Sequence, residues 1–120
     1  MAKNSLGLSC PQSYLEADQD LLDVVCNGCG SAQAKFDFVP DTIYGLSISP
    51  ACHIHDWMYY EGKTIDDKEE ADRVFLNNML RIINNQSANK LICFLRRRRA
   101  VVYYEMVCNL GGPAFWHGKE

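Results

Sequence analysis

Histidine, aspartate and tyrosine occur together in the stretch ACHIHDWMYYEG, residues 51–62. Residues four apart share one face of a helix, so His55 is expected beside Tyr59, with Asp56 projecting next to that row. A histidine with one ring nitrogen held by a carboxylate keeps a fixed tautomer, and its other nitrogen can take a proton near neutral pH. A second, adjacent carboxylate is then available for a hard cation. The stretch therefore predicts acid–base chemistry beside a metal ligand.

Another carboxylate, Asp72, is predicted to lie on the apolar side of its helix, where a charged residue is unusual. It precedes Phe75 by three residues, Leu76 by four and Met79 by seven, which places it on the apolar stripe. Because burial of an unpaired carboxylate is costly, an imidazole or a tyrosine hydroxyl is expected to pair with it. The short connection between the two helices favours an antiparallel pair, in which His55 can meet Asp72.

The segment NGCGS, residues 27–31, is the third chemical feature. Calcium binds carboxylate and main-chain carbonyl oxygens, and glycines give a loop the backbone freedom to point its carbonyls at an ion. This segment opens a stretch, residues 27–50, that has glycines and prolines but no sustained period. Loops of that length inside a small domain are usually functional.

The elements that must position these residues are predicted to be helices. Helical spacing of apolar residues indicates the segments, and Ser49, Pro50 and Thr64 supply start signals. Gly62 is the expected C-cap of the helix that carries His55. No repeat and no convincing hairpin is visible, so we expect a mostly α fold with two long antiparallel helices, a glycine-rich calcium loop and additional helices. The predicted helices cover residues 14–26, 50–61, 64–84 and 90–110.

Length and composition limit the protein to one small domain over residues 1–120. The chain has a mass of 13.6 kDa, 48% hydrophobic residues and a formal charge of −3, so a second domain and general nucleic-acid binding are not expected. No run of 18 apolar residues and no apolar leader is visible, so neither a membrane span nor a signal peptide is predicted. We therefore expect a cytoplasmic protein, or one released by another route, for example with a phage.

Six cysteines leave two structural interpretations open. They can form disulfides, for which six cysteines allow 15 connectivities, or they can be small buried hydrophobic residues. The pair Cys26 and Cys29 has the spacing of a zinc motif, and Cys52 with His53 or Cys108 would complete four ligands. That arrangement would make the protein a zinc-stabilised binding module. The six are Cys10, Cys26, Cys29, Cys52, Cys93 and Cys108.

Together, these residues resemble the secreted phospholipases A2. The family's catalytic helix reads C-C-x-x-H-D-x-C-Y, its second helix carries a C-D pair, and its bacterial, fungal and group XII branches have a G-C-S or G-C-G-S calcium loop. The resemblance extends over about residues 26–84. This chain matches the motifs at Cys29, Cys52, His55, Asp56, Tyr59 and Asp72, and it has Ala51, Met58 and Ala71 where the family has cysteines.

The resemblance implies calcium-dependent hydrolysis of the sn-2 ester of glycerophospholipids at a membrane surface. His55 would be the general base, Asp72 would orient its ring, and Tyr59 would hydrogen-bond to Asp72. Calcium would be held by Asp56 and by the carbonyls of the loop, and the loop cysteine would pair with the cysteine that precedes the His-Asp pair. The residues implied for these last two roles are Asn27, Gly28 and Gly30 for calcium, and Cys29 with Cys52 for the disulfide.

The linker between loop and helix is longer here than in the bacterial relatives, so rival calcium ligands are the carbonyls around residues 44–46. The block Arg96–Arg99 fits either a solvated face that pairs with the acids of residues 66–70 or an attraction to anionic lipid. A non-catalytic lipid- or protein-binding module, stabilised by zinc or disulfides, remains the alternative function. Four further residues have weaker expected roles: Tyr103 or Tyr104 as a second hydroxyl on Asp72, and Trp57 and Trp116 as lining of an acyl channel, as an interfacial ring or as core.

Overall fold

The computed structural model of the protein describes residues 1–26, 39–117 and 119. This part of the chain is mostly helical, as the sequence predicts, and it also contains two short hairpins. The helices are α1 (Gln12–Glu16), α2 (Gln19–Val25), α3 (Ser49–Glu61), α4 (Ile65–Gln86), α5 (Lys90–Leu110) and α6 (Gly112–Trp116). The strands are β1 (Ala2–Lys3), β2 (Ser9–Cys10), β3 (Thr42–Ile43) and β4 (Leu46–Ser47).

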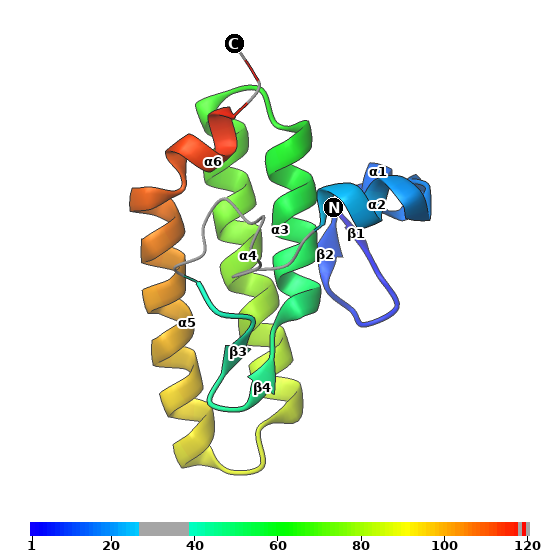
Figure 1. Ribbon diagram of the computed structural model, residues 1–120. Coiled ribbons are helices and arrows are strands. Elements are labelled where there is room, and N and C mark those ends of the chain that lie inside the picture. Colours follow the sequence, from blue (N-terminus) through cyan, green and yellow to red (C-terminus); the bar gives the residue numbers. More distant parts are fainter. Residues whose placement is uncertain (27–38, 118, 120) are drawn as a thin grey trace.

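The three long helices lie side by side, with α4 between α3 and α5 (Figure 1). Residues 62–64 turn the chain from α3 into α4, and residues 87–89 turn it from α4 into α5. Both connections are short, so each pair of neighbouring helices runs antiparallel, as expected for the first pair. The short helix α6 packs against α3 and the end of α5. The arrangement gives α4 two buried sides, one against each neighbour.

Local capping explains where α4 and α5 begin. Thr64 and Asp67 form a reciprocal capping box, in which the Asp67 amide donates to Thr64 Oγ1 at 3.2 Å and the Thr64 amide donates to Asp67 Oδ2 at 3.1 Å. At α5, Asn89 Oδ1 accepts from the amide of Ile92 at 2.9 Å. The starts of these two helices agree with the sequence prediction.

Helix α3 begins without the cap that the sequence suggested. It starts at Ser49, and the N-cap position is occupied by Ile48, whose side chain makes no capping hydrogen bond. Ile48 is completely buried, so packing against the core fixes the start of α3 in place of a polar cap. Gly62 is the C-cap, as predicted, and a methyl group there would lie 2.6 Å from the ring of Phe115. The close approach of α6 therefore requires this glycine.

The prediction of one continuous helix over residues 14–26 is wrong. The chain forms α1 and α2 instead, with extended backbone at Ala17 and Asp18 between them. Neither helix has a fully buried residue, so no continuous apolar face stabilises one longer helix. Contacts with α3 orient α1, because Trp57 Nε1 donates to Ser13 Oγ at 3.1 Å and the Trp57 ring packs edge-on against a tyrosine of α1.

The expectation of no hairpin is also wrong. Strands β3 and β4 pair across a two-residue turn at Tyr44 and Gly45, both of which have positive φ. Strands β1 and β2 form the other hairpin. The buried side chain of Asn78 in α4 hydrogen-bonds to β2: its amide donates to Ser9 O at 2.9 Å and its oxygen accepts from Ser9 N at 2.8 Å. Tertiary hydrogen bonds of this kind have no signature in a single sequence.

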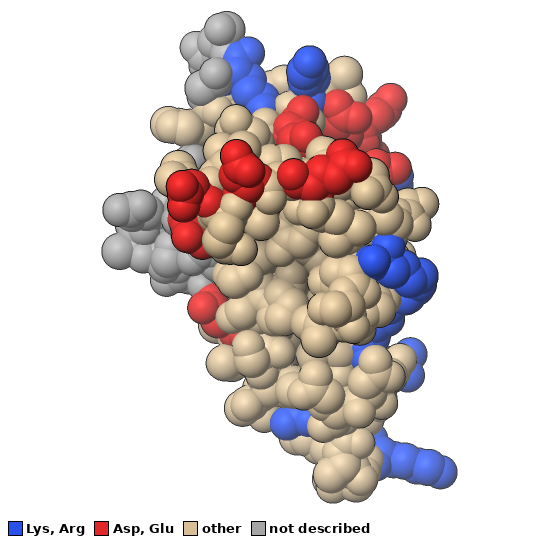
Figure 2. Space-filling model, turned by 90° about the vertical axis from the view of Figure 1, so that its right-hand side faces the viewer, with Lys and Arg blue, Asp and Glu red and all other residues tan. Residues whose placement is uncertain are grey.

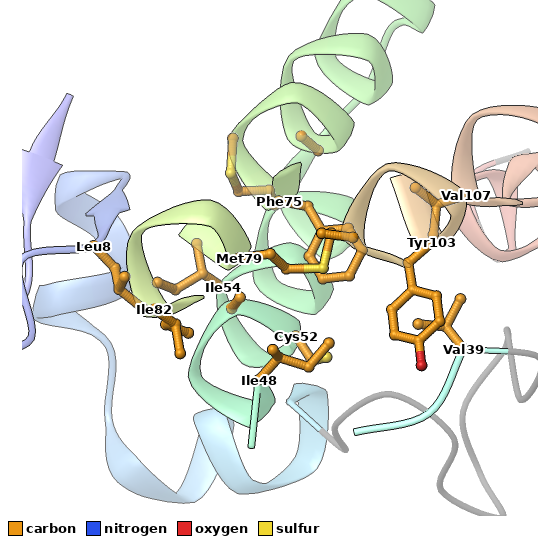
Figure 3. Packing of buried hydrophobic residues seen from close by; sticks show 14 of the residues in the cluster. Leu8, Val39, Ile48, Cys52, Ile54, Phe75, Met79, Ile82, Tyr103 and Val107 are labelled. Carbon is orange, nitrogen blue, oxygen red and sulfur yellow. The ribbon is translucent and has the colours of Figure 1, made fainter. Parts of the chain in front are cut away.

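The core lies where α3, α4, α5 and the β3–β4 hairpin meet (Figure 3). Phe75 and Met79 of α4 point toward α3 on one side and toward Tyr103 of α5 on the other in this view. At three buried positions this chain has a small or apolar residue where the phospholipases A2 that it resembles have cysteines. Side-chain packing therefore joins the helices at these points. They are Ala51, Met58 and Ala71.

Within the described ranges, the chain has no helix with the length and apolar character needed to cross a bilayer.

Candidate active site

His55 of α3 and Asp72 of α4 meet at the centre of the helix pair. His55 Nε2 lies 2.8 Å from Asp72 Oδ1. Both residues are only 1% exposed, so the contact is shielded from water. The contact that the helical spacing predicts is therefore present.

Both oxygens of the Asp72 carboxylate accept hydrogen bonds from described side chains. Besides the imidazole, the hydroxyl of Tyr59 donates to Oδ1 at 2.7 Å, as expected from its place one turn after His55. Oδ2 accepts from the ammonium of Lys68 at 2.8 Å. Of the two tyrosines expected as a second hydroxyl partner, Tyr103 donates instead to the carbonyl of Thr42 at 3.0 Å, and Tyr104 hydrogen-bonds with Cys108.

Lys68 is the site residue that the sequence interpretation missed. It is 5% exposed, and its Nζ also donates to the carbonyls of Val107 at 3.0 Å and Cys108 at 3.4 Å. These carbonyls belong to the last turn of α5, the end of a helix that attracts positive charge, and the carbonyl of Val107 also accepts from the amide of Gly111 at 2.9 Å. The signal was present in the spacing, since Lys68 lies four residues before Asp72 and seven before Phe75, on the same stripe.

Burial and the neighbouring charges set the protonation states. Burial lowers the pKa of His55, and the charge of Lys68 also lowers it, against the opposing influence of Asp72. For Asp72, burial would raise the pKa, but the bonds from His55, Lys68 and Tyr59 outweigh it and leave the pKa lowered. At neutral pH the imidazole is therefore neutral and the carboxylate ionised. Nε2–H then donates to Asp72, which makes Nδ1 the basic nitrogen.

Aromatic side chains enclose the imidazole. The ring of Phe75 stacks on that of His55 with centroids 4.6 Å apart and planes 27° apart, and the Tyr59 ring lies 4.2 Å away at a tilt of 47°. Burial also raises the pKa of Tyr59, as does the charge of Asp72, so its hydroxyl remains a donor. Apolar walls of this kind strengthen the hydrogen bonds to Asp72 and restrict the ring to one orientation.

Asp56, the predicted calcium ligand, is half-buried next to His55 in α3. The pKa of the Cys26 thiol, at the end of α2, is raised to about 12. Burial is the main cause, and the negative charge of Asp56 adds to it. Cys26, the last described residue before the predicted calcium loop, is therefore within the electrostatic range of Asp56. The other predicted ligands, Asn27, Gly28 and Gly30, lie outside the described residues. In the part that is described, no three His, Cys, Asp or Glu side chains gather as a metal site.

The rival ligands at residues 44–46 already face positive charge. The carbonyl of Tyr44 accepts from Arg96 Nη2 at 2.9 Å, and the Tyr44 hydroxyl accepts from Arg99 Nη2 at 3.1 Å. A calcium ion at this turn would meet two guanidinium groups, which disfavours it. Two arginines of the basic block therefore attach the β3–β4 hairpin to α5, rather than pairing with the acids of residues 66–70.

The described cysteines comprise one disulfide-bonded residue and four free thiols. Cys52, completely buried in the first turn of α3, is disulfide-bonded. Its predicted partner, Cys29, lies outside the described residues, so this pairing stays a prediction. Because Cys52 is bonded, it cannot supply a thiolate to the zinc site considered above. The described cysteines with free thiols are Cys10, Cys26, Cys93 and Cys108.

Three other residues considered in the sequence, two tryptophans and a histidine, have contacts or burial that can be described. Trp57 is 3% exposed and anchors α1 through its indole N–H, which favours a packing role. Trp116 is exposed and packs edge-on against the Phe115 ring with centroids 4.8 Å apart. His53 is half-buried, and burial lowers its pKa, against the opposing influence of Asp41.

Comparisons with known proteins give no match: no family model fits the chain, and neither the curated proteins nor the solved structures contain a significant relative.

Proposed function

We propose that the protein is a calcium-dependent phospholipase A2 that hydrolyses the sn-2 ester of glycerophospholipids. One observation carries the proposal, namely the buried contact between His55 and Asp72 across two antiparallel helices. The hydroxyl of Tyr59 on the same carboxylate and the adjacent Asp56 add to it. The order of these residues along the chain is the order of the phospholipase motif.

In this mechanism His55 is the general base. Its Nδ1 accepts a proton from the water that attacks the ester carbonyl, and the lowered pKa keeps that nitrogen unprotonated at neutral pH. Asp72 fixes the tautomer through Nε2 and stabilises the imidazolium after proton transfer. Tyr59 and Lys68 hold the carboxylate in place from two sides. The proton then passes from His55 to the leaving alcohol.

Calcium would be held by Asp56 and the loop carbonyls of Asn27, Gly28 and Gly30. When bound, the ion would polarise the ester carbonyl and stabilise the negative charge that develops on its oxygen. Asp56 suits this role because it is only half-buried and directly follows His55 in α3. Oxygen donors alone fit calcium rather than zinc.

The alternative is a non-catalytic binding module. A zinc-stabilised form is disfavoured by the bonded state of Cys52. A disulfide-stabilised form would keep the fold and release no fatty acid. The two functions therefore differ in one measurable property, which is calcium-dependent ester hydrolysis.

The decisive experiment measures fatty-acid release from phospholipid vesicles labelled separately at the sn-1 and sn-2 positions. We expect sn-2 release with calcium, and a loss of about 10²- to 10⁴-fold for His55→Gln, the usual contribution of a general base. EGTA and Asp56→Asn should each remove the calcium-dependent rate. Release of both labels, or equal release with EGTA, would contradict the proposal.

His53→Gln is the matched control, because it changes the same residue type two positions earlier in α3. It should keep near wild-type activity. Circular dichroism of each variant distinguishes a lost function from a lost fold. If wild-type protein releases nothing with calcium but still binds vesicles, the non-catalytic module is the better description.

A further inference from the structure

The outer side of α5 exposes a row of large apolar side chains. The helix packs against α4 and the β3–β4 hairpin through Ala100, Tyr103 and Val107, its buried residues. Leu91 and Phe94 on the other side are 69% and 54% exposed. Spacings of three, four and seven residues align the apolar side chains along one side of the helix. The row comprises Leu91, Phe94, Leu95, Val101 and Val102, all exposed.

Basic side chains border this apolar row. Arg96 and Arg99 are engaged by Tyr44, whereas Arg97 and Arg98 are exposed on the outer side together with Lys90. The guanidinium of Arg98 lies 5.7 Å above the ring of its neighbour in the row, Phe94. A surface cavity of 480 Å³ opens here, lined by Lys90, Cys93, Phe94, Arg97, Arg98 and Val101.

The positive charge of this face is local. Helix α5 has five basic residues and one acidic residue, although the chain has a formal charge of −3. Residues 12–25, which contain α1 and α2, carry four acidic and no basic residues. Figure 2, which views the molecule from the side of α1 and α2, shows acidic side chains gathered across the upper half of that face. Helix α5 therefore has a local excess of positive charge, and it lies on the other side of α4 from α3 (Figure 1).

We propose that the outer face of α5 docks onto the surface of an anionic lipid bilayer. Apolar side chains would enter the boundary between headgroups and acyl chains, while Lys90, Arg97 and Arg98 bind the phosphates. A helix lying flat presents its whole length, about 30 Å, to the surface. The choice of a bilayer as partner rests on the proposed function. The charge and the apolar character of the face are observed independently of that function.

Lipid fits this face better than the other anionic partners. A nucleic acid would contact the basic side chains but would leave the aliphatic row exposed to water. An acidic protein would need a matching apolar strip. A second copy of the chain would bring two copies of this basic face together, because a twofold contact pairs identical surface patches.

The test measures binding to vesicles by flotation, with EGTA present so that hydrolysis does not interfere. Vesicles of phosphatidylcholine with phosphatidylglycerol are compared with pure phosphatidylcholine. Arg97→Gln with Arg98→Gln should weaken binding to the anionic vesicles about 30-fold, at roughly fivefold for each basic residue. The control, Lys3→Gln with Lys63→Gln, removes the same charge from exposed positions elsewhere and should change binding less than twofold.

A second pair of variants tests the apolar row. Leu91→Ser with Phe94→Ser should weaken binding at least tenfold, whereas Leu6→Ser with Val24→Ser, equally exposed residues near the N-terminus, should not. Equal binding to both kinds of vesicle would overturn the inference. So would loss of binding in the Leu6 and Val24 variant, which would place the lipid surface at the N-terminal helices.

The outcomes separate this inference from the proposed function. Calcium-dependent fatty-acid release without any effect of the α5 variants on vesicle binding would refute the docking surface alone. Binding that depends on α5, without release, would refute the enzyme alone. Concentration-dependent dimers in sedimentation that are lost in the Phe94→Ser variant, with no vesicle binding, would reassign the face to a second copy.

Discussion

Asp72 is a carboxylate that the fold buries almost completely and surrounds with donors. An isolated buried charge is unfavourable by several kcal/mol, and the cost is offset only when its oxygens are well bonded. Here the imidazole and a phenol bind Oδ1 while an ammonium binds Oδ2. The ammonium supplies the balancing positive charge. The histidine can therefore remain neutral, which is the state a general base requires.

Replacement of Lys68 by methionine should be strongly destabilising. The variant leaves Asp72 buried without its counter-charge and leaves the carbonyls of Val107 and Cys108 without that donor. We expect the free energy of unfolding to fall by about 3–5 kcal/mol, the usual cost of removing one partner of a buried pair. Urea denaturation at pH 7 measures it.

Lys63→Met provides the control, because Lys63 is exposed in the turn before α4. Its effect should stay within about 0.5 kcal/mol. A double variant with Asp72→Asn should be less destabilised than the sum of its two single changes. Additive effects would mean that Lys68 and Asp72 stabilise the protein independently.

The residues of the candidate site were predictable to different degrees. His55, Tyr59 and Asp72 could be placed from helical spacing, because residues on one helix face are fixed by its period. Lys68 was on the same stripe, but a lysine is usually a surface residue, and only the end of α5 explains its burial. The acceptors on α5 lie about forty residues away in the sequence, beyond the range of any local pattern.

Helices α5 and α6 pack against the candidate site at Tyr59. The chain passes between these helices at Gly111, where a methyl group would lie 2.6 Å from the Tyr59 hydroxyl and 2.5 Å from the carbonyl of Val107. The junction is therefore packed against the residue that donates to Asp72. The site depends on three helices and the start of a fourth, and not on α3 and α4 alone.

Gly111→Ala should therefore destabilise the protein and disturb the site. Overpacking of this kind costs about 1–3 kcal/mol, and displacement of the Tyr59 hydroxyl should also reduce any esterase activity. Thermal unfolding and the vesicle assay measure the two effects. Gly112→Ala is the matched control, because a methyl group there meets nothing within 4 Å. If both variants behave alike, the close approach at Gly111 is not important.

Element prediction succeeded where local signals were strong. The start of α4 and both ends of α5 agree with their caps and with the glycines that follow. It failed at α1 and α2, which bury too little apolar surface for a periodic pattern to decide their continuity. It also missed the β3–β4 hairpin, whose Tyr44-Gly45 turn is held by arginines of α5 rather than by its own sequence.

For the whole molecule, buried titratable groups should make folding stability depend on pH. The pKa of His55 is lowered from its ordinary value of 6.5, so the unfolded chain binds a proton that the folded protein resists. Stability is then full above about pH 6.5 and declines as the pH falls through that value. The lowered pKa of Asp72 adds a further loss below its ordinary value of 3.8.

We expect the free energy of unfolding to fall between pH 6.5 and pH 5, with a slope of up to about 1.4 kcal/mol per pH unit from each proton taken up. His53, whose pKa burial also lowers, contributes in the same direction. Urea denaturation at several pH values, with EGTA present, measures the slope. His55→Asn should reduce it, and an unchanged slope in that variant would show that His55 does not carry this proton.

The sequence by itself determined the helical class, the starts of α4 and α5 and the alignment of His55, Tyr59 and Asp72, because caps and helical periods are local properties of the chain. The tertiary structure decided which groups surround the carboxylate, that Lys68 is buried, and that the arginine block divides into two hairpin anchors and two outward charges. These depend on which helix ends and faces meet. Such contacts arise from packing between distant segments, and no spacing along the chain encodes them.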